Sequence, residues 1–393
     1  MQTDVIIIGG GLHGCSIALH LAQQGFKPIV LEKNIVGRHA SGVNAGGVRQ
    51  LMRDVAEIPL SIAAMDIWEN LDRLLGSHLA ETCEFISRVG QVGVAASASE
   101  LAWCEQRTAE MKALGYDLEE MLDAKGVRRL VPTLSDMCIG GIVSRRDGHA
   151  NPFRSTQAFR ARAEQLGARF YEHTCVTDVA EAGSKWQLDT TRGQMHADIV
   201  VNCGGAWAWQ IAGMIGEQLP STHLALTLMV TSRIQRFLDP VVIGIDRKLS
   251  LKQTEVGTVV IGGGVLGEPD LDAGTTLTVA DRMVESARTV WDFFPILRQA
   301  TIVRTWAGLE AVTPDILPII GASSVAKNFW HVFGFSGHGF QLGPIVGSVI
   351  SEMIADGKSA FSIAAFSPAR FSNGAIASGA IHAAQHEQQG ATG

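Results

Sequence analysis

Apolar and polar residues at the start of the chain follow the pattern of a β-α-β unit. Residues 4–8 form a continuous apolar run that ends in glycines, which is typical of a strand buried on both faces of a parallel sheet. Residues 14–24 repeat apolar side chains on one helical face, and residues 28–31 form a second apolar run. This pattern predicts the opening of a doubly wound α/β domain.

The rest of the chain alternates between helical and strand patterns that predict two sheets. Spacing for one apolar face predicts helices over 59–75, 99–114, 282–293 and 344–356, and a further helix that ends at residue 166. Strands of the first sheet are expected near 169–173, 186–190 and 195–202. Strands of a different sheet are expected at 224–232, 241–245 and 258–262. Pro344 is expected at the first position of the last helix.

Composition narrows the classes of protein that fit this pattern. With 393 residues, 46% hydrophobic and 18% charged, the chain is expected to form two globular domains. A net charge of −7 argues against a nucleic-acid partner, since phosphate binding needs a basic surface. No apolar run reaches the roughly 18 residues of a membrane helix, and the first strand begins too early for a secretory signal. We therefore expect a cytoplasmic protein, with peripheral attachment to the inner membrane through partners left open.

The six cysteines are scattered, and none forms a C-x-x-C pair. The sequence therefore suggests neither a zinc site nor a disulfide framework, and no metal is expected. We interpret the cysteines as reduced and mostly buried.

A glycine motif follows the first strand. Residues 9–14 read GGGLHG, which fits G-x-G-x-x-G, and Glu32 follows eighteen positions after Gly14. In this motif Gly9 allows a tight turn, Gly11 lets backbone approach a pyrophosphate, and Gly14 lets the helix sit close to the strand. The helix N-terminus attracts phosphate, while the carboxylate of Glu32 suits ribose hydroxyls and disfavours NADP. The alternative is a glycine turn with no ligand, and the motif alone leaves FAD and NAD open.

A second glycine cluster lies near the other end of the chain. Residues 333–347 read FGFSGHGFQLGPIVG and lead into the expected helix at 344–356. FAD is a long cofactor whose ring lies far from its adenosine and needs a second cradle, so this cluster favours FAD. A helix N-terminus there would stabilise negative charge on the flavin ring. The alternative is an ordinary glycine-proline helix start in a surface loop.

These motifs together resemble the D-amino-acid-oxidase-type superfamily of FAD-dependent amine oxidoreductases. The resemblance covers nearly the whole chain and rests on VIIIGGGLHG at 5–14, LEK at 31–33, ASGVNAGGVR at 40–49, DGHANP at 147–152, NCGGAW at 202–207, WAGLEAVTPDILPIIG at 306–321 and GFSGHGFQLGP at 334–344. Within the superfamily, the chain is most similar to β-type catalytic subunits of proline, hydroxyproline, opine and glycine dehydrogenases and to sarcosine oxidase relatives.

The resemblance implies a fold and a set of cofactor-binding residues. It implies an α/β FAD-binding Rossmann-like domain of the glutathione-reductase type, interleaved with an α+β substrate domain on an antiparallel sheet. The first domain is expected over residues 1–82, 149–218 and 304–371, the second over 83–148 and 219–303, and a flexible tail over 372–393. The implied FAD-binding residues are Gly9, Gly11, Leu12, His13, Gly14, Glu32, Lys33, Arg38, His39, Ala40, Ser41, Gly46, Gly47, Val176, Cys203, Gly204, Trp207, Gly308, Gly337, His338, Gly339, Phe340 and Gln341.

The resemblance also implies a chemistry, which is oxidation of a carbon–nitrogen bond by hydride transfer to flavin N5. Arg49 and His338 are the expected catalytic residues, Arg49 as a holder of substrate carboxylate or as a flavin contact. Each has a structural alternative, a salt bridge for Arg49 and backbone bonding for His338. Lys252 and Arg304 are further candidates. A covalent flavin link at His39 is conceivable, but we expect non-covalent binding.

Two departures from the family pattern bear on the reaction. Glu310 stands where several amino-acid oxidases carry an arginine, and residues 259–262 lack the lysine that monomeric sarcosine oxidases use with oxygen. Both favour a dehydrogenase of an amino acid or secondary amine that passes electrons to a partner subunit or carrier. The alternatives are a non-catalytic flavin-binding or electron-relay subunit and a 2-hydroxy-acid oxidoreductase on the same fold.

Overall fold

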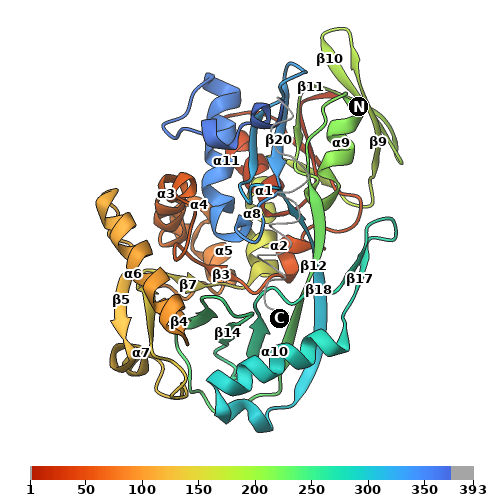
Figure 1. The fold of residues 1–393 in the computed structure, drawn as a ribbon. Helices are drawn as coiled ribbons and strands as arrows, with labels where there is room; N and C mark the ends of the chain where they lie inside the picture. Colours follow the sequence, from red (N-terminus) through yellow and green to blue (C-terminus); the bar gives the residue numbers. More distant parts are fainter. Residues whose placement is uncertain (1, 373–393) are drawn as a thin grey trace.

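The structure is a computed structural model that describes residues 2–372 (Figure 1). The flexible tail expected over residues 372–393 lies, apart from Ser372, outside the described residues. Two eight-stranded sheets organise the described part of the chain, and helices pack against both.

The first sheet has a parallel centre. Its main path runs β19-β20-β11-β1-β2-β8, and β1 pairs in parallel with both β11 and β2. Strands β10 and β9 extend β11 as an antiparallel meander. The strands are β1 Gln2–Ile8, β2 Ile29–Leu31, β8 Arg169–Tyr171, β9 Val176–Ala182, β10 Lys185–Thr190, β11 Gly193–Asn202, β19 Ile319–Ala322 and β20 Phe329–Phe333.

Alternate residues of β1 face two different layers, because successive side chains of a strand point to opposite sides. Val5 and Ile7 pack into the core formed with the helices α1 (Leu12–Gln23), α3 (Ile58–Trp68), α8 (Pro152–Gln165) and α11 (Gly339–Asp356). Ile6 and Ile8 pack against the meander and the helix α9 (Ala208–Met214). Both faces are therefore covered, which explains why β1 is a continuous apolar run.

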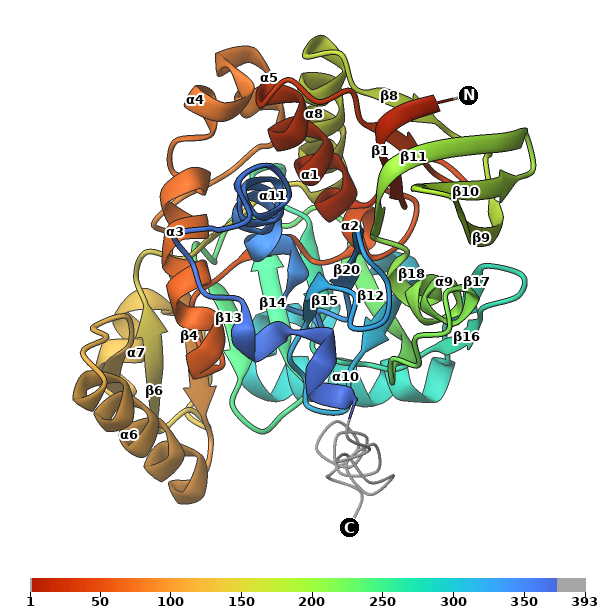
Figure 2. The same ribbon diagram turned by 90° about the horizontal axis from the view of Figure 1, so that it is seen from above.

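The helices α1 and α11 lie against each other over the first sheet (Figures 1 and 2). A Cβ at Gly347 would lie 2.1 Å from Ser16 Oγ, and a Cβ at Gly343 would lie 2.6 Å from a methyl carbon of Leu12. These glycines therefore allow the two helices to approach closely, which holds both ends of the chain in one core.

The second sheet is mixed and mostly antiparallel, with the order β18-β12-β15-β14-β13-β4-β6-β5. One of its faces packs on the helix α10 (Ala280–Phe293) through Val290 and Phe293. Its strands are β4 Gln91–Ala95, β5 Glu120–Asp123, β6 Gly140–Ser144, β12 Thr222–Thr231, β13 Val241–Gly244, β14 Ser250–Gln253, β15 Val259–Gly262 and β18 Ile302–Val312.

The remaining elements lie between the strands of the two sheets or after α11. The helices are α2 Ala40–Val43, α4 Leu71–Leu75, α5 Ser77–Thr82, α6 Ala98–Ala113 and α7 Ala124–Leu130. The short strands are β3 Gly47–Val48, β7 Gly148–His149, β16 Glu268–Asp270 and β17 Thr275–Leu277. The 3-10 turns are η1 Val55–Glu57, η2 Gly205–Trp207, η3 Pro295–Gln299, η4 Ala364–Phe366 and η5 Pro368–Phe371.

The predicted fold class is confirmed, but two helices differ from the prediction. The single helix expected over 59–75 is broken, because the side-chain amide of Asn70 donates to the Asp66 carbonyl that the next helical N–H would have used. Pro344 lies inside α11 rather than at its first position, since packing on α1 extends the helix back to Gly339. The expected domain boundary at residue 304 falls inside β18, which pairs with β12 of the second sheet.

Candidate cofactor and active site

A cavity of about 790 Å³ opens between the two sheets. One wall is built at the carboxyl ends of β1, β2 and β11, where Ile8, Leu31 and Cys203 line it. The opposite wall comes from the second sheet and includes Leu226 and Lys252. Ligands of open parallel sheets bind at this position, outside the carboxyl ends of the strands.

The turn between β1 and α1 forms one end of the cavity and depends on glycine. Gly9 has φ +111°, and a Cβ there would lie 2.3 Å from the Cys203 carbonyl oxygen. A Cβ at Gly14 would lie 2.0 Å from the Gly9 carbonyl oxygen. The N–H of Leu12 donates to Ser41 Oγ at 2.9 Å, which ties the start of α1 to the loop that follows β2. The turn thus places the N-terminus of α1 at the cavity, and a helix N-terminus attracts anions.

Glu32 and Lys33 stand at the end of β2 beside that turn. The Glu32 carboxylate accepts hydrogen bonds from the N–H groups of Gly10 at 2.7 Å and Asn34 at 2.8 Å. Burial raises the pKa of Glu32, although both hydrogen bonds oppose this. Lys33 Nζ lies 3.0 Å from the ring centroid of Trp207, and burial lowers the pKa of this amine to about 8. A carboxylate, a cation and an aromatic face thus surround one end of the cavity.

The loop from residue 37 to residue 47 runs along the cavity and contains the short helix α2. Gly46 has φ +77°, and a Cβ there would lie 2.1 Å from the Ala150 carbonyl oxygen and 2.8 Å from Lys252 Nζ. His39 packs on Trp207 with ring centroids 4.7 Å apart. The small residue at position 46 therefore lets the loop pass close to β14 and to the segment before α8.

The N-terminus of α11 forms the other end of the cavity. Gly337 has φ +85°, and a Cβ at Gly339 would lie 2.9 Å from Phe335 Cβ. The ring of Phe335 stacks on His13 of α1 with centroids 3.8 Å apart. Since α11 has 18 residues, its N-terminus carries the partial positive charge of a full helix dipole.

These features fit FAD. The cavity offers an anion-binding glycine turn at one end and a second helix N-terminus at the other. Glycines stand where a Cβ would meet backbone, as expected where a flat or phosphorylated group touches the main chain. All but one of the predicted FAD-binding residues line this cavity, although they come from segments more than three hundred residues apart.

Gln341 is the exception. It is fully buried in α11 behind the cavity wall, where its amide Nε2 donates to the Ser61 carbonyl at 2.7 Å. Its backbone carbonyl accepts a hydrogen bond of 2.8 Å from Trp68 Nε1. Both bonds join Gln341 to α3. Gln341 therefore packs α11 against α3 and does not line the cavity.

Arg49 and His338, the expected catalytic residues, both line the cavity. Arg49 Nη1 donates to the Leu51 carbonyl at 2.7 Å, and burial lowers the pKa of its guanidinium. His338 Nδ1 lies 2.8 Å from Glu57 Oε2. Arg304 lies at the exposed start of β18, where its guanidinium is 5.7 Å from the Trp306 ring centroid, and it does not line the cavity.

The protonation states of His338 and Glu57 follow from their surroundings. Burial lowers the pKa of His338 to about 4. Burial opposes ionisation of Glu57, but the hydrogen bond from His338 and the charges of Arg53 and Arg49 lower its pKa overall. A neutral ring beside an ionised carboxylate donates its Nδ1–H, which leaves Nε2 as a hydrogen-bond acceptor.

Sequence reasoning missed or undervalued three residues of this site. Glu57 carries no motif and reaches His338 only through the fold. Lys252 on β14 lies opposite Val260, so a strand next to residues 259–262 supplies a buried amine whose pKa is lowered by burial to about 8. Glu310 lines the cavity and accepts a hydrogen bond from Gly337 N–H. The four residues of β14 do not alternate between buried and exposed positions, so no local pattern marks Lys252, and none marks Glu57.

Within residues 2–372, no cluster of three or more His, Cys, Asp or Glu side chains is arranged to hold a metal ion. None of the helices described there combines the length and apolar character needed to cross a membrane. All six cysteines have free thiols, and five are buried, as expected.

Residues 4–353 match the protein family described as FAD dependent oxidoreductase. The chain is 25% identical over 387 residues to human mitochondrial dimethylglycine dehydrogenase, a match that covers 92% of this chain and 43% of that protein. It is 28% identical over 383 residues to gamma-glutamylputrescine oxidoreductase of Escherichia coli strain K12, covering 92% of this chain and 86% of that protein. The chain thus spans less than half the length of the dimethylglycine dehydrogenases that it matches.

Solved structures give the same fold. The L-proline dehydrogenase from P. horikoshii superimposes with a TM-score of 0.87 and 27% identity, covering 96% of this chain and 99% of that one. The glycine oxidase from Geobacillus kaustophilus superimposes with a TM-score of 0.83 and 22% identity, covering 94% and 99%. The second likeness, at this identity, speaks for the fold alone.

Proposed function

The chain belongs to the family of FAD-dependent oxidoreductases, and from this premise we propose that it oxidises the C–N bond of an amino acid or secondary amine. Its cofactor is FAD. The proposed substrates resemble proline, hydroxyproline, an opine, sarcosine or glycine. The electrons would pass to a partner subunit or a carrier.

The observation that carries the proposal is the continuity of the cavity. It joins the glycine turn after β1 to the N-terminus of α11, and it extends beyond them to the wall formed by the second sheet. The first two parts suit the ends of FAD, and the remaining wall borders space for a small substrate beside the α11 end. Leu226 and Leu309 are apolar parts of that wall, which would exclude water from a reacting carbon.

The residues of the cavity indicate which roles the protein would have and which the cofactor would have. Bound FAD would supply a ring that accepts a hydride from the carbon next to the substrate nitrogen. Arg49, which is partly buried, and Lys252, which is buried, line the cavity and could hold a substrate carboxylate. His338, with Nε2 as an acceptor, could bind a substrate N–H.

One similarity supports transfer of electrons to a partner. Sarcosine oxidase subunit beta from Rhizobium meliloti is 25% identical to this chain, and the match covers 92% of the chain and 86% of that protein. Its name describes a subunit, which is consistent with a chain that acts within a larger assembly. Lys252, however, provides a buried amine next to the loop at Gly46, so a direct reaction with oxygen stays a second outcome of the experiment below.

The experiment is an anaerobic reduction screen on the purified yellow protein. Proline, hydroxyproline, sarcosine, glycine, an opine and several 2-hydroxy acids are each mixed with it, and the loss of flavin absorbance is followed. Bleaching by an amine supports the proposal. Bleaching only by 2-hydroxy acids would instead select a hydroxy-acid oxidoreductase, and no bleaching by any compound would leave a flavin-binding subunit that relays electrons.

The same sample identifies the electron acceptor. After an amine has bleached the flavin, air or an artificial electron carrier is admitted and the return of colour is timed. Slow recovery in air with rapid recovery by the carrier supports a dehydrogenase. Rapid recovery in air, together with release of hydrogen peroxide, would assign an oxidase.

A further inference from the structure

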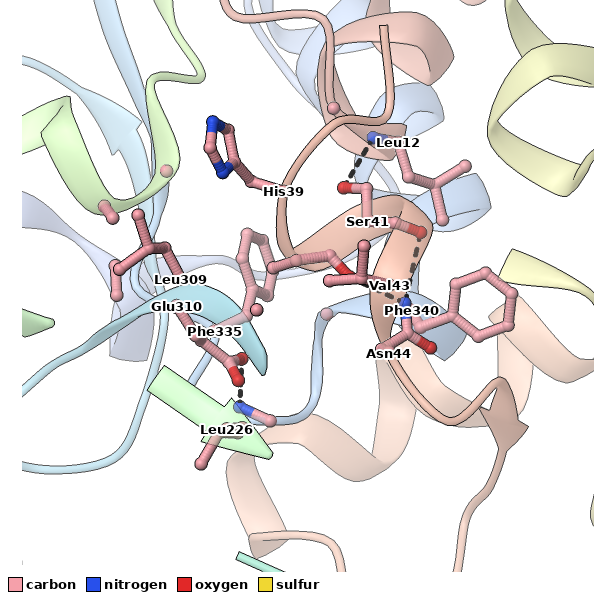
Figure 3. A pocket seen from close by; sticks show the side chains of 18 of the residues that line it. Leu12, His39, Ser41, Val43, Asn44, Leu226, Leu309, Glu310, Phe335 and Phe340 are labelled. Atoms are coloured by element: carbon pink, nitrogen blue, oxygen red, sulfur yellow. Dashed lines mark hydrogen bonds between the residues drawn. The ribbon is translucent and has the colours of Figure 1, made fainter. Parts of the chain in front are cut away.

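Glu310 is an acidic side chain in the cavity wall for which no neighbouring cation is provided. Its Oε1 accepts a hydrogen bond of 2.5 Å from Gly337 N–H, next to the N-terminus of α11. Figure 3 shows the carboxylate beside the apolar side chains of Leu226, Leu309 and Phe335. Within residues 2–372, no protein hydrogen bond reaches Oε2, which leaves that oxygen free to bind a ligand in the cavity.

The surroundings of Glu310 make its charge unfavourable. Burial raises the pKa of its carboxyl to about 7, and only the Gly337 N–H opposes this rise. Three titratable groups along the facing walls have partners of their own. His338 bonds to Glu57, Lys252 Nζ donates to a backbone carbonyl at 3.3 Å, and Arg49 donates to another.

A carboxylate held among apolar side chains without a counter-charge destabilises a fold. Such groups are concentrated at functional sites, where a ligand supplies the missing charge. Glu310 lines the cavity, so a group bound in the cavity can reach Oε2. The missing partner is therefore best sought in the substrate.

Resting on the proposed oxidation of an amine, we propose that Glu310 recognises the positively charged nitrogen of the substrate and then accepts a proton from it. One N–H bond of the ammonium group breaks, and one O–H bond forms at Oε2. The nitrogen regains the lone pair that oxidation of its neighbouring carbon requires, and no electrons leave the substrate in this step. Glu310 thus acts as both a specificity residue and a proton acceptor.

This role narrows the substrate class. The substrate carries an amine that is cationic at neutral pH, and any carboxylate it has lies away from Glu310, on the side of Arg49 or Lys252. A 2-hydroxy acid brings only negative charge to the cavity, which an ionised Glu310 repels. The geometry therefore favours amines over hydroxy acids at this wall.

The first test measures cation binding without any reaction. Tetramethylammonium is titrated into the FAD-loaded protein, and binding is followed by the change in flavin absorbance. Wild-type protein should bind the cation, with affinity falling as the pH drops through about 7. Glu310→Gln should weaken binding by roughly 10-fold or more and remove its pH dependence. The control Glu268→Gln, on the exposed strand β16, should behave as wild type.

The second test measures anaerobic reduction by whichever amine bleaches the wild-type flavin. In Glu310→Gln the apparent Kd of the amine should rise by roughly 10- to 100-fold. The pH at which the limiting reduction rate reaches half its maximum should move upward by about one unit or more, because solvent must then take the proton. A rate profile and Kd that match wild type would overturn the proposal.

The outcomes separate this inference from the proposed function. If no amine bleaches wild-type protein, the proposed oxidation of amines is wrong. The tetramethylammonium titration still tests whether Glu310 binds a cation. If amines bleach wild type and Glu310→Gln alike, the function stands and the role of Glu310 fails. Should Glu310→Gln not take up FAD, Glu310→Asp keeps the charge and must retain cation binding and its pH dependence. Loss of both in Glu310→Asp would also overturn the proposal.

Discussion

Replacing Glu57 with glutamine should strongly destabilise the protein, because it leaves a buried arginine without a counter-charge. The side chains of Arg53 and Glu57 are 1% and 0% exposed, and their closest N–O distance is 3.9 Å. The other acceptors of Arg53 are neutral: the backbone carbonyls of Arg49 and His338 and the side chain of Gln341. In the described part of the chain, Glu57 is the carboxylate within ion-pair distance of Arg53.

Coulomb's law and the typical cost of breaking a buried ion pair give similar sizes for this loss of stability. Unit charges about 4 Å apart interact by about 4 kcal/mol at an effective dielectric constant of about 20. Removal of one partner from a buried ion pair costs about 3–5 kcal/mol. We therefore expect Glu57→Gln to lower the free energy of unfolding by about 3 kcal/mol or more, a large share of the total stability of a typical domain.

The assay is urea unfolding at pH 7.5, followed by tryptophan fluorescence, on Glu57→Gln and a matched control. The control is Glu164→Gln, which removes the exposed 3.1 Å pair with Arg160 and should change stability by less than about 0.5 kcal/mol. Combining Glu57→Gln with Arg53→Met should cost less than the sum of the single changes, because the uncompensated charge is then gone. Equal effects of Glu57→Gln and Glu164→Gln would refute the reasoning.

Three more predictions concern a glycine of the cofactor turn, Arg49 and the buried histidines. Gly14→Ala should abolish or greatly weaken FAD uptake and destabilise the protein by about 1–3 kcal/mol, because its Cβ would meet backbone at 2.0 Å. Gly213→Ala, in open space on α9, should do neither, and retention of FAD by the first variant would contradict the proposed turn. Arg49→Ala should lose reduction by substrate but keep flavin, as flavin absorbance and anaerobic mixing would show; unchanged activity would remove Arg49 from the reaction. The third concerns pH, because burial lowers the pKa of five histidines to about 3–4, namely His13, His20, His39, His149 and His338. Only the unfolded chain therefore binds these protons between pH 6.5 and about 4, so the histidines make stability fall as the pH decreases. The raised pKa values of Asp147, about 6, and Glu310, about 7, offset part of this fall. Urea midpoints that do not change between pH 7 and pH 5 would contradict this.

Local sequence patterns predicted much of the first sheet and its cofactor turn. The apolar run before Gly9 and the glycines themselves report backbone geometry directly, so β1, α1 and β2 could be located without the fold. The predicted FAD cofactor and family are confirmed. Both could be predicted because their motifs lie in continuous segments of the chain. The helix break at Asn70 was missed because it depends on one side-chain hydrogen bond.

The substrate side could not be predicted to the same extent, because its residues meet only through pairing between distant strands. Glu310 faces the cavity because β18 pairs with β12 over their full length. Lys252 belongs to a strand that the hydrophobic pattern did not reveal. The sequence pattern showed only the neighbouring strand β15, which carries no lysine. Glu57 meets His338 although they lie 281 positions apart. Such contacts carry no signature in a single sequence.

The central claim is that one cavity binds both ends of a single FAD molecule. A crystal structure of the FAD-loaded protein tests this claim most directly. The account predicts electron density for one FAD per chain, with its adenosine beside Glu32 and Val176 and its flavin ring beside Gly337 and Gly339. Density that reverses these ends, or that places FAD outside the cavity between the two sheets, would contradict the account.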